Sequence, residues 1–162
     1  MFFSVIAVSV ILVISEKSKQ PELSEEELSK IVEEESNQSN AQSLPPPEFT
    51  LPEGDVAELQ IIDLVEGSGD EVNPNATVKV HYHGVRASDG FVFDSSYEKG
   101  EPIEFPLNGV IAGWQEGIPG MKVGGKRQLN IPSDKAYGEQ GAGEDIPPNT
   151  DLVFVVELLE IK

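Results

Sequence analysis

Six short stretches in the last two thirds of the chain have the hydrophobic pattern of β-strands. In ATVKVHYHGV, residues 76–85, Val78, Val80 and Tyr82 alternate with polar side chains, as in a strand with one buried face. Turn sequences rich in Gly, Asn, Asp and Pro separate such stretches from one another. The expected strands cover 57–67, 76–85, 91–96, 102–107, 126–134 and 151–161.

One stretch has helical periodicity instead. Ile111, Trp114 and Ile118 recur at intervals of three and four residues, which places them on one face of a short helix over 110–118. The surrounding segment GVIAGWQEGIPGM, 109–121, holds four glycines, and glycine inside a helix costs about 1 kcal/mol relative to alanine. Such a helix can approach a sheet closely, so we expect Trp114, the only tryptophan, to point towards a concave sheet. There it is either part of the core or the floor of a pocket.

These elements predict an α+β domain in which a curved, mostly antiparallel β-sheet of about five strands packs against one short α-helix. Residues 136–150 are rich in Gly, Pro and polar side chains and are expected to form a long irregular loop before the last strand.

The first 54 residues differ in composition from this domain. Residues 1–14 are apolar; the run is shorter than the roughly 20 residues of a membrane span and suits an export signal or a short membrane anchor. We therefore expect the protein to be secreted or to lie in the cell envelope, where residues 1–14 could attach it to the membrane. The cytoplasm is the alternative location. Residues 15–54 predict a disordered acidic linker with a marginal helix near 24–35. The folded domain is expected to cover 55–162.

The charge and the lack of cysteine exclude several kinds of function. With 29 acidic and 11 basic residues the net charge is −18, which repels phosphate backbones, so nucleic acid is not expected as a partner. The chain has no cysteine, which excludes disulfides, thiol nucleophiles and zinc–thiolate sites. We expect a monomer.

No conventional catalytic set is evident in the sequence. His81 and His83 share one face of a strand without a third metal ligand nearby, so we expect solvent-facing histidines and no metal. Asp94 follows apolar residues and is expected at a pocket edge. The remaining candidates are aromatic and form either the core or the lining of an apolar ligand pocket: Tyr82, Phe93, Phe105, Trp114, Tyr137 and Phe154.

Several motifs in the domain resemble the FKBP-type peptidyl-prolyl isomerase family. They are VHYHG (80–84), DGFVFDSS (89–96), VIAGWQEG (110–117), MKVGGKRQLNIP (121–132), AYG (136–138) and IPPNTDLVFVVELL (146–159). They occur in the family's order and at similar spacing over roughly residues 57–162. The resemblance implies a five-stranded antiparallel sheet wrapped around a short helix. It also implies an enzyme that accelerates rotation about X-Pro bonds, and so assists folding, without a metal or cofactor.

The same resemblance implies roles for individual residues. Trp114 would be the floor under the substrate proline, the Ile111 backbone N–H would donate to the substrate, and Tyr137 would bond a substrate carbonyl. Tyr82 would be a wall, and Asp94 would line the polar side. The positions implied to bind substrate are Phe93, Ile103, Phe105, Val110, Ile146 and Phe154, of which Ile103 stands where the family often has an aromatic wall and Ile146 belongs to the loop over the pocket.

The partners implied are proline-containing polypeptides and macrolides such as rapamycin. Two alternatives remain open. The domain could be a non-catalytic chaperone or scaffold module that binds prolyl segments, or a carrier for an acidic segment that makes the interactions.

Overall fold

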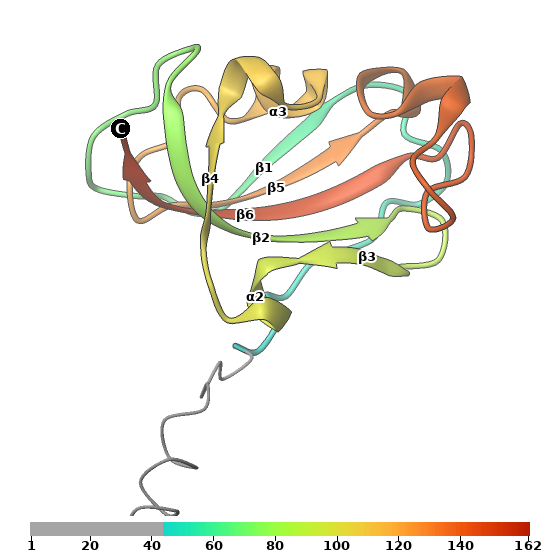
Figure 1. Ribbon diagram of the computed structural model, residues 1–162, viewed down its shortest axis with the longest axis horizontal. Helices are drawn as coiled ribbons and strands as arrows, with labels where there is room; N and C mark the ends of the chain where they lie inside the picture. Colours follow the sequence, from blue (N-terminus) through green and yellow to red (C-terminus); the bar gives the residue numbers. More distant parts are fainter. Residues whose placement is uncertain (1–43) are drawn as a thin grey trace, which may run out of the picture. The chain divides into compact units, whose positions relative to one another are not determined.

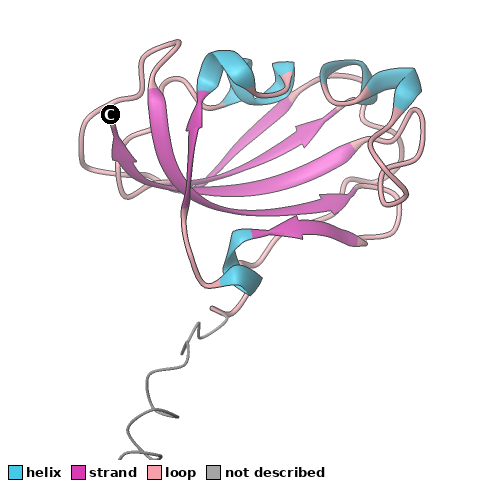
Figure 2. Ribbon diagram, in the orientation of Figure 1, coloured by secondary structure: helices cyan, strands magenta, loops and turns pink. Residues whose placement is uncertain are grey.

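The computed structural model describes residues 44–162, so the expected export or anchor segment 1–14, the marginal helix near 24–35 and most of the expected linker lie outside them. Six antiparallel strands form one sheet that curves around the short helix α3 (Ala112–Gly117), as Figures 1 and 2 show. The strands are β1 (Gln60–Val65), β2 (Thr77–Arg86), β3 (Val92–Ser95), β4 (Ile103–Pro106), β5 (Lys126–Ile131) and β6 (Leu152–Ile161). Their path is β1-β5-β6-β2-β3, and β4 also pairs with β2.

Strands β3 and β4 share one edge of β2. β4 pairs with Thr77–Val80 and β3 pairs with residues 83–85, while β6 pairs along the opposite edge. The one-turn helix α2 (Ser96–Lys99) connects β3 to β4 in the chain. Because β3 and β4 pair with the same edge of β2, the six strands occupy five positions across the sheet. The predicted α+β fold with its short helix is confirmed.

The glycines of α3 allow the helix to lie directly on β5. A Cβ atom at Gly113 would clash with the side chain of Ile131, and one at Gly117 would lie only 2.7 Å from a methyl carbon of Leu129. Alanine would favour the helix itself but would push it away from the sheet. Close packing against β5 is thus the reason for a helix with weak intrinsic propensity.

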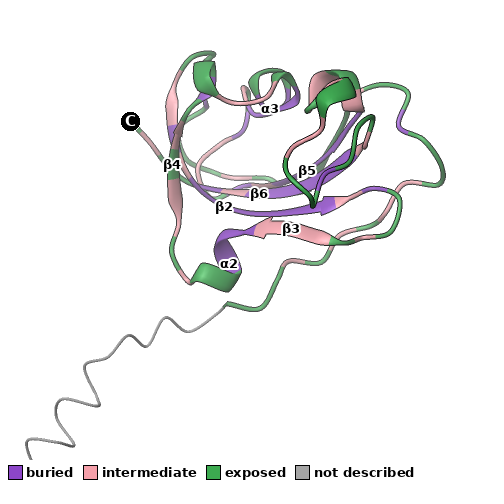
Figure 3. Cartoon of the chain, turned by 45° about the vertical axis from the view of Figure 1, so that its right-hand side comes forward, coloured by how far each residue is buried: buried purple, intermediate pink, exposed green. Residues whose placement is uncertain are grey.

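The main core lies between α3 and the concave face of the sheet, where β2, β5 and β6 are the most buried strands (Figure 3). Val78 and Val80 of β2, Leu129 of β5 and Leu158 of β6 have no exposed surface. Ile118, just after α3, is equally buried. This core fixes the relative positions of the helix and the sheet.

Residues 44–56, which we call the strap, lie against the opposite face of the sheet. The Leu44 N–H donates to the carbonyl of Tyr97, and the amide of Gln128 both donates to the carbonyl of Thr50 (2.7 Å) and accepts from its N–H (3.1 Å). The Val56 N–H donates to the carboxylate of Asp151 at 2.8 Å. Residues 44–54 fall within the segment expected to be a linker, and here they contact the domain.

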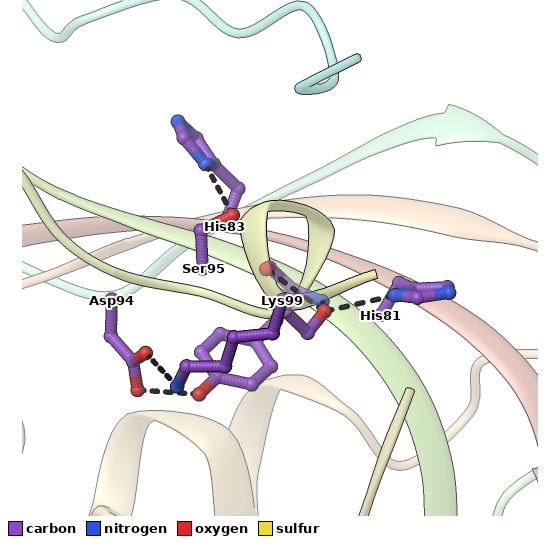
Figure 4. Close-up of polar contacts among 7 residues, drawn as sticks. His81, His83, Asp94, Ser95 and Lys99 are labelled. Atoms are coloured by element: carbon purple, nitrogen blue, oxygen red, sulfur yellow. Dashed lines mark hydrogen bonds and ion pairs between the residues drawn. The ribbon is translucent and has the colours of Figure 1, made fainter. Parts of the chain in front are cut away.

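The strap and α2 bury the two histidines of β2. His81 is 8% exposed and His83 is 4% exposed, so the expectation of solvent-facing histidines is wrong. The Nδ1 atoms of His81 and His83 lie 3.0 Å from the hydroxyls of Ser96 and Ser95, respectively (Figure 4). Burial lowers the pKa of His83, although the charge of Glu98 acts in the opposite direction.

Short turns complete the described part of the chain. They are the 3-10 turns η1 (Leu107–Gly109), η2 (Ser133–Lys135) and η3 (Gly138–Gln140). The last two lie in or beside the expected irregular loop at 136–150. No helix between residues 44 and 162 is both long and apolar enough to cross a membrane.

Candidate active site

A cavity of about 300 Å³ lies between α3 and the concave face of the sheet. Its lining comes from β2, β3, β4, β6, the start of α3 and the turn before η3. The lining residues are Tyr82, Phe93, Asp94, Phe105, Gly109, Val110, Ile111, Trp114, Tyr137 and Phe154.

Trp114 lines the floor of this cavity within a cage of aromatic rings. Its ring centroid is 5.7 Å from Tyr82, 5.5 Å from Phe105 and 5.3 Å from Phe154, with ring planes 78–84° apart. Edge-to-face contacts of this kind are favourable and hold rings in fixed orientations. Trp114 is 4% exposed, and its indole N–H has no acceptor among the described residues. It therefore belongs to the core and to the pocket at once.

Asp94 accepts hydrogen bonds from two side chains at the cavity edge. The Tyr82 hydroxyl donates to one carboxylate oxygen at 2.5 Å, and the Lys99 ammonium donates to the other at 2.6 Å. Figure 4 shows Asp94 and Lys99 on one side of β3 and His83 on the other. β3 and α2 thus place a fixed negative charge and its counterion at the rim.

These contacts determine the ionisation of the site. Burial would raise the pKa of Asp94, but the bonds from Lys99 and Tyr82 outweigh it and the pKa is lowered. Burial and then the bond to Asp94 raise the pKa of Tyr82 well above its ordinary value. Burial and the charge of Asp94 also raise the pKa of Tyr137. Near neutral pH, Asp94 is therefore a carboxylate and both tyrosines are neutral donors.

Two donors at the cavity have no acceptor in the described part of the chain. The Ile111 N–H precedes the first turn of α3 and donates to no group in residues 44–162, whereas the Ile111 carbonyl accepts from the N–H groups of Trp114 and Gln115. Tyr137 is 39% exposed, and its hydroxyl forms no hydrogen bond with any residue between 44 and 162. Both groups are free to donate to a bound molecule.

The structure brings together all but two of the residues expected at the site. Ile146 is buried in the core, with 5% of its surface exposed, and does not line the cavity. Ile103 packs half-buried against the core, while Phe105, two residues further along the same face of β4, lines the cavity beside Trp114. The aromatic wall is therefore at Phe105.

Two contributors were not selected from the sequence. Gly109 lines the cavity, and its position directly before VIAGW was the only available signal. Lys99 pairs with Asp94 from the following helix, a contact between residues five apart that a strand-based interpretation of 91–96 does not indicate.

The chemistry of this arrangement is that of a binding pocket with polar groups at its rim. Between residues 44 and 162, no group of three or more His, Asp or Glu side chains is placed to hold a metal ion. The cavity can enclose a small apolar ring over Trp114 and offer hydrogen-bond donors to polar atoms next to that ring.

Comparison with known proteins adds an independent finding. Residues 69–159 match the family model of FKBP-type peptidyl-prolyl cis-trans isomerases. A probable FK506-binding protein of Corynebacterium glutamicum is 52% identical over 114 residues, covering 70% of this chain and 96% of that protein. The expected domain, residues 55–162, makes up less than 70% of the chain. A match that covers 70% of the chain must therefore include residues of the strap as well.

Two further proteins give the same result at different coverage. The FKBP-type 22 kDa peptidyl-prolyl cis-trans isomerase of Escherichia coli is 53% identical over 103 residues, covering 64% of this chain but only half of that protein. A crystal structure of a peptidyl-prolyl cis-trans isomerase from Pseudomonas syringae is 39% identical with a TM-score of 0.60, covering 67% of this chain and 80% of that one.

Proposed function

Because the chain belongs to the FKBP-type peptidyl-prolyl cis-trans isomerase family, its reaction is rotation about X-Pro peptide bonds, and we propose that the cavity over Trp114 is where this rotation takes place. The observation that carries the proposal is the aromatic cage around Trp114 with unpaired donors at its rim. The cavity is large enough to take a prolyl ring against Trp114 with its amide at the edge. In this role the domain assists the folding of proline-containing polypeptides.

The proposed mechanism lowers the barrier without making or breaking a covalent bond. Conjugation across the C–N bond imposes a barrier of roughly 18–20 kcal/mol on rotation. A dry aromatic pocket disfavours the charge-separated resonance form that stiffens the bond, since few groups near Trp114 solvate charge. Lowering the barrier by about 6 kcal/mol would accelerate the reaction roughly 10⁴-fold.

The polar groups at the rim would hold the flanking peptide during rotation. The Ile111 N–H and the Tyr137 hydroxyl are the proposed donors to substrate carbonyl groups. The Tyr82 hydroxyl donates to Asp94, and this bond holds the Tyr82 ring edge-to-face against Trp114. Donors that match the twisted amide better than either planar isomer would stabilise the transition state.

An isomerisation assay on the full chain tests this proposal. A short peptide with one X-Pro bond should reach its cis–trans equilibrium faster in the presence of the protein, in proportion to protein concentration. Binding of the peptide without any acceleration would favour the non-catalytic prolyl-binding module and contradict the enzyme.

We also propose that the cavity takes a macrolide of the rapamycin type. The FK506-binding name of the Corynebacterium relative and the apolar lining around Trp114 support this. Rapamycin should quench or shift the emission of Trp114 and inhibit isomerisation competitively with the peptide. An unchanged emission spectrum and rate at saturating drug would contradict it.

Location in the cell envelope or outside the cell is a further proposal. Its support is the apolar composition of residues 1–14, which lie outside the described part of the chain. Cell fractionation tests it, since recovery of the protein only in the cytosolic fraction would contradict it.

A further inference from the structure

We propose that the ion pair between Glu116 and Lys135 sets the width of the pocket mouth by tying α3 to the turn that carries Tyr137. The Lys135 ammonium lies 2.7 Å and 2.6 Å from the two carboxylate oxygens of Glu116. The inference rests on the proposed function, because it assigns positioning residues to the same pocket.

Each end of the pair belongs to an element that forms part of the pocket. Glu116 is in α3, two residues after Trp114, and Lys135 ends η2, two residues before Tyr137. Trp114 lies at the floor of the cavity and Tyr137 at its rim. The pair therefore connects the floor of the pocket to one side of its mouth.

No other polar contact joins these two elements in the described structure. Among residues 44–162, the Glu116–Lys135 pair is the only hydrogen bond or ion pair between α3 and residues 133–149. The turn has other anchors, but they lead to different elements. The Ser133 N–H donates to Asp151 at 2.8 Å, and the Asn149 N–H donates to the carbonyl of Gly138 at 2.8 Å.

Neither residue touches the cavity, so both act through others. The lining includes Trp114 and Tyr137 but not Glu116 or Lys135. Side-chain exposures of 51% for Glu116 and 31% for Lys135 make the pair accessible to salt. Loss of a partly exposed pair of this kind changes an equilibrium constant by about two- to fivefold.

The expected consequence is a change in substrate affinity more than in the chemical step. With the pair broken, the Tyr137 turn can move away from α3, and a bound prolyl peptide loses contacts at the rim. Tyr82, Asp94 and Trp114 keep their positions, because their contacts do not involve Glu116 or Lys135. KM should therefore rise while kcat stays close to its original value.

Charge exchange in the full-length protein tests the proposal. Glu116→Gln and Lys135→Met should each raise KM about two- to fivefold, and Glu116→Lys combined with Lys135→Glu should restore most of the loss. Raising the salt concentration should raise KM of the unmodified protein but not further raise that of Glu116→Gln. Glu66→Gln, which breaks the exposed pair with Lys122 outside the cavity lining, is the matched control and should leave KM unchanged.

Fluorescence provides a readout that does not depend on turnover. Trp114 is the only tryptophan, and a wider mouth exposes more of its ring to solvent without moving it, so its emission without ligand should shift in both single variants and return in the exchanged pair. Unchanged KM and emission in the single variants, or no recovery in the exchanged pair, would overturn the proposal. An unmodified protein without isomerase activity would instead contradict the proposed function, and emission alone would then decide whether residues 116 and 135 are coupled.

Discussion

The ring of Phe49 lies 5.6 Å from the imidazole of His83, across the face of the sheet that is turned away from the pocket. Phe49 belongs to the strap and His83 to β2, next to Tyr82 of the pocket wall. The strap therefore shields a titratable group that is separated from the proposed active site only by the thickness of one strand.

Phe49→Ala should raise the pKa of His83 towards its ordinary value of 6.5, because burial is the main cause of its lowered pKa. Titration of the two imidazoles by NMR in the full chain measures this directly. Glu53→Ala, at an exposed strap position, is the control and should leave the titration unchanged. An identical His83 titration in Phe49→Ala would mean that the strap does not cover this histidine in solution.

The same burial predicts a dependence of stability on pH. Below about pH 6.5 the unfolded chain binds a proton at residue 83 more readily than the folded chain does. The contribution of neutral His83 is present above that pH and is lost as the pH falls towards the folded-state pKa. Denaturant unfolding at a series of pH values should show this loss, and it should be smaller in Phe49→Ala.

Removal of the strap should destabilise the domain. A chain that begins at residue 57 loses the apolar contacts of Phe49 and Leu51, and the buried amide of Gln128 loses both bonds to the backbone of Thr50 and keeps only its bond to Asn130. Compared with a chain that begins at residue 44, we expect it to be less stable by about 2 kcal/mol or more. Equal unfolding free energies for the two would place the domain boundary near the predicted residue 55.

Lys99→Met should raise the pKa of Asp94. The substitution removes the ammonium that donates to the carboxylate, while the hydrogen bond from Tyr82 remains. The stabilising effect of ionised Asp94 is present above its ordinary pKa of 3.8 and is lost as the pH falls below that value. Carboxyl carbon shifts followed by NMR measure the change, and an unchanged or lower pKa in the variant would contradict the ion pair.

Isomerase activity should vary little between roughly pH 6 and 8, because Asp94 stays ionised and Tyr82 and Tyr137 stay neutral in that range. Chelators should leave the rate unchanged. A steep pH step near neutrality, or loss of activity after metal removal, would mean that a group outside the proposed set takes part.

Tyr137→Phe should lower kcat/KM by about fivefold, the equivalent of roughly 1 kcal/mol for one lost hydrogen bond. The hydroxyl has no hydrogen-bond partner between residues 44 and 162, so the folded chain loses little stability. Thermal unfolding of the variant is the control. An unchanged kcat/KM would remove the hydroxyl from the mechanism.

The sequence predicted the features that follow from local pattern. The spacing of Ile111, Trp114 and Ile118 identified the helix, and the glycines around Trp114 indicated its close approach to the sheet. The histidines show the limit of such reasoning. Alternation along β2 separates its two faces, but it does not reveal that the strap covers the second one, because a polar, proline-rich segment has no periodicity of its own.

Positions at the site were also predictable only up to a point. Ile103 and Phe105 share one face of β4, and only the three-dimensional path of the strand decides which of them reaches Trp114. Lys99 depends on the one-turn helix α2, where the strand-like pattern of 91–96 ends. Pairings of this kind arise from tertiary structure and leave no periodic signal in the sequence.

Catalytic efficiency of Trp114→Leu on a prolyl peptide tests the central claim most directly. Leucine keeps an apolar side chain between α3 and the sheet but removes the flat ring that the aromatic cage holds in place. With the fold verified by circular dichroism, we predict that kcat/KM falls by about tenfold or more and that peptide affinity changes. A folded Trp114→Leu protein with unchanged kcat/KM and unchanged peptide affinity would show that rotation about the X-Pro bond does not take place over Trp114.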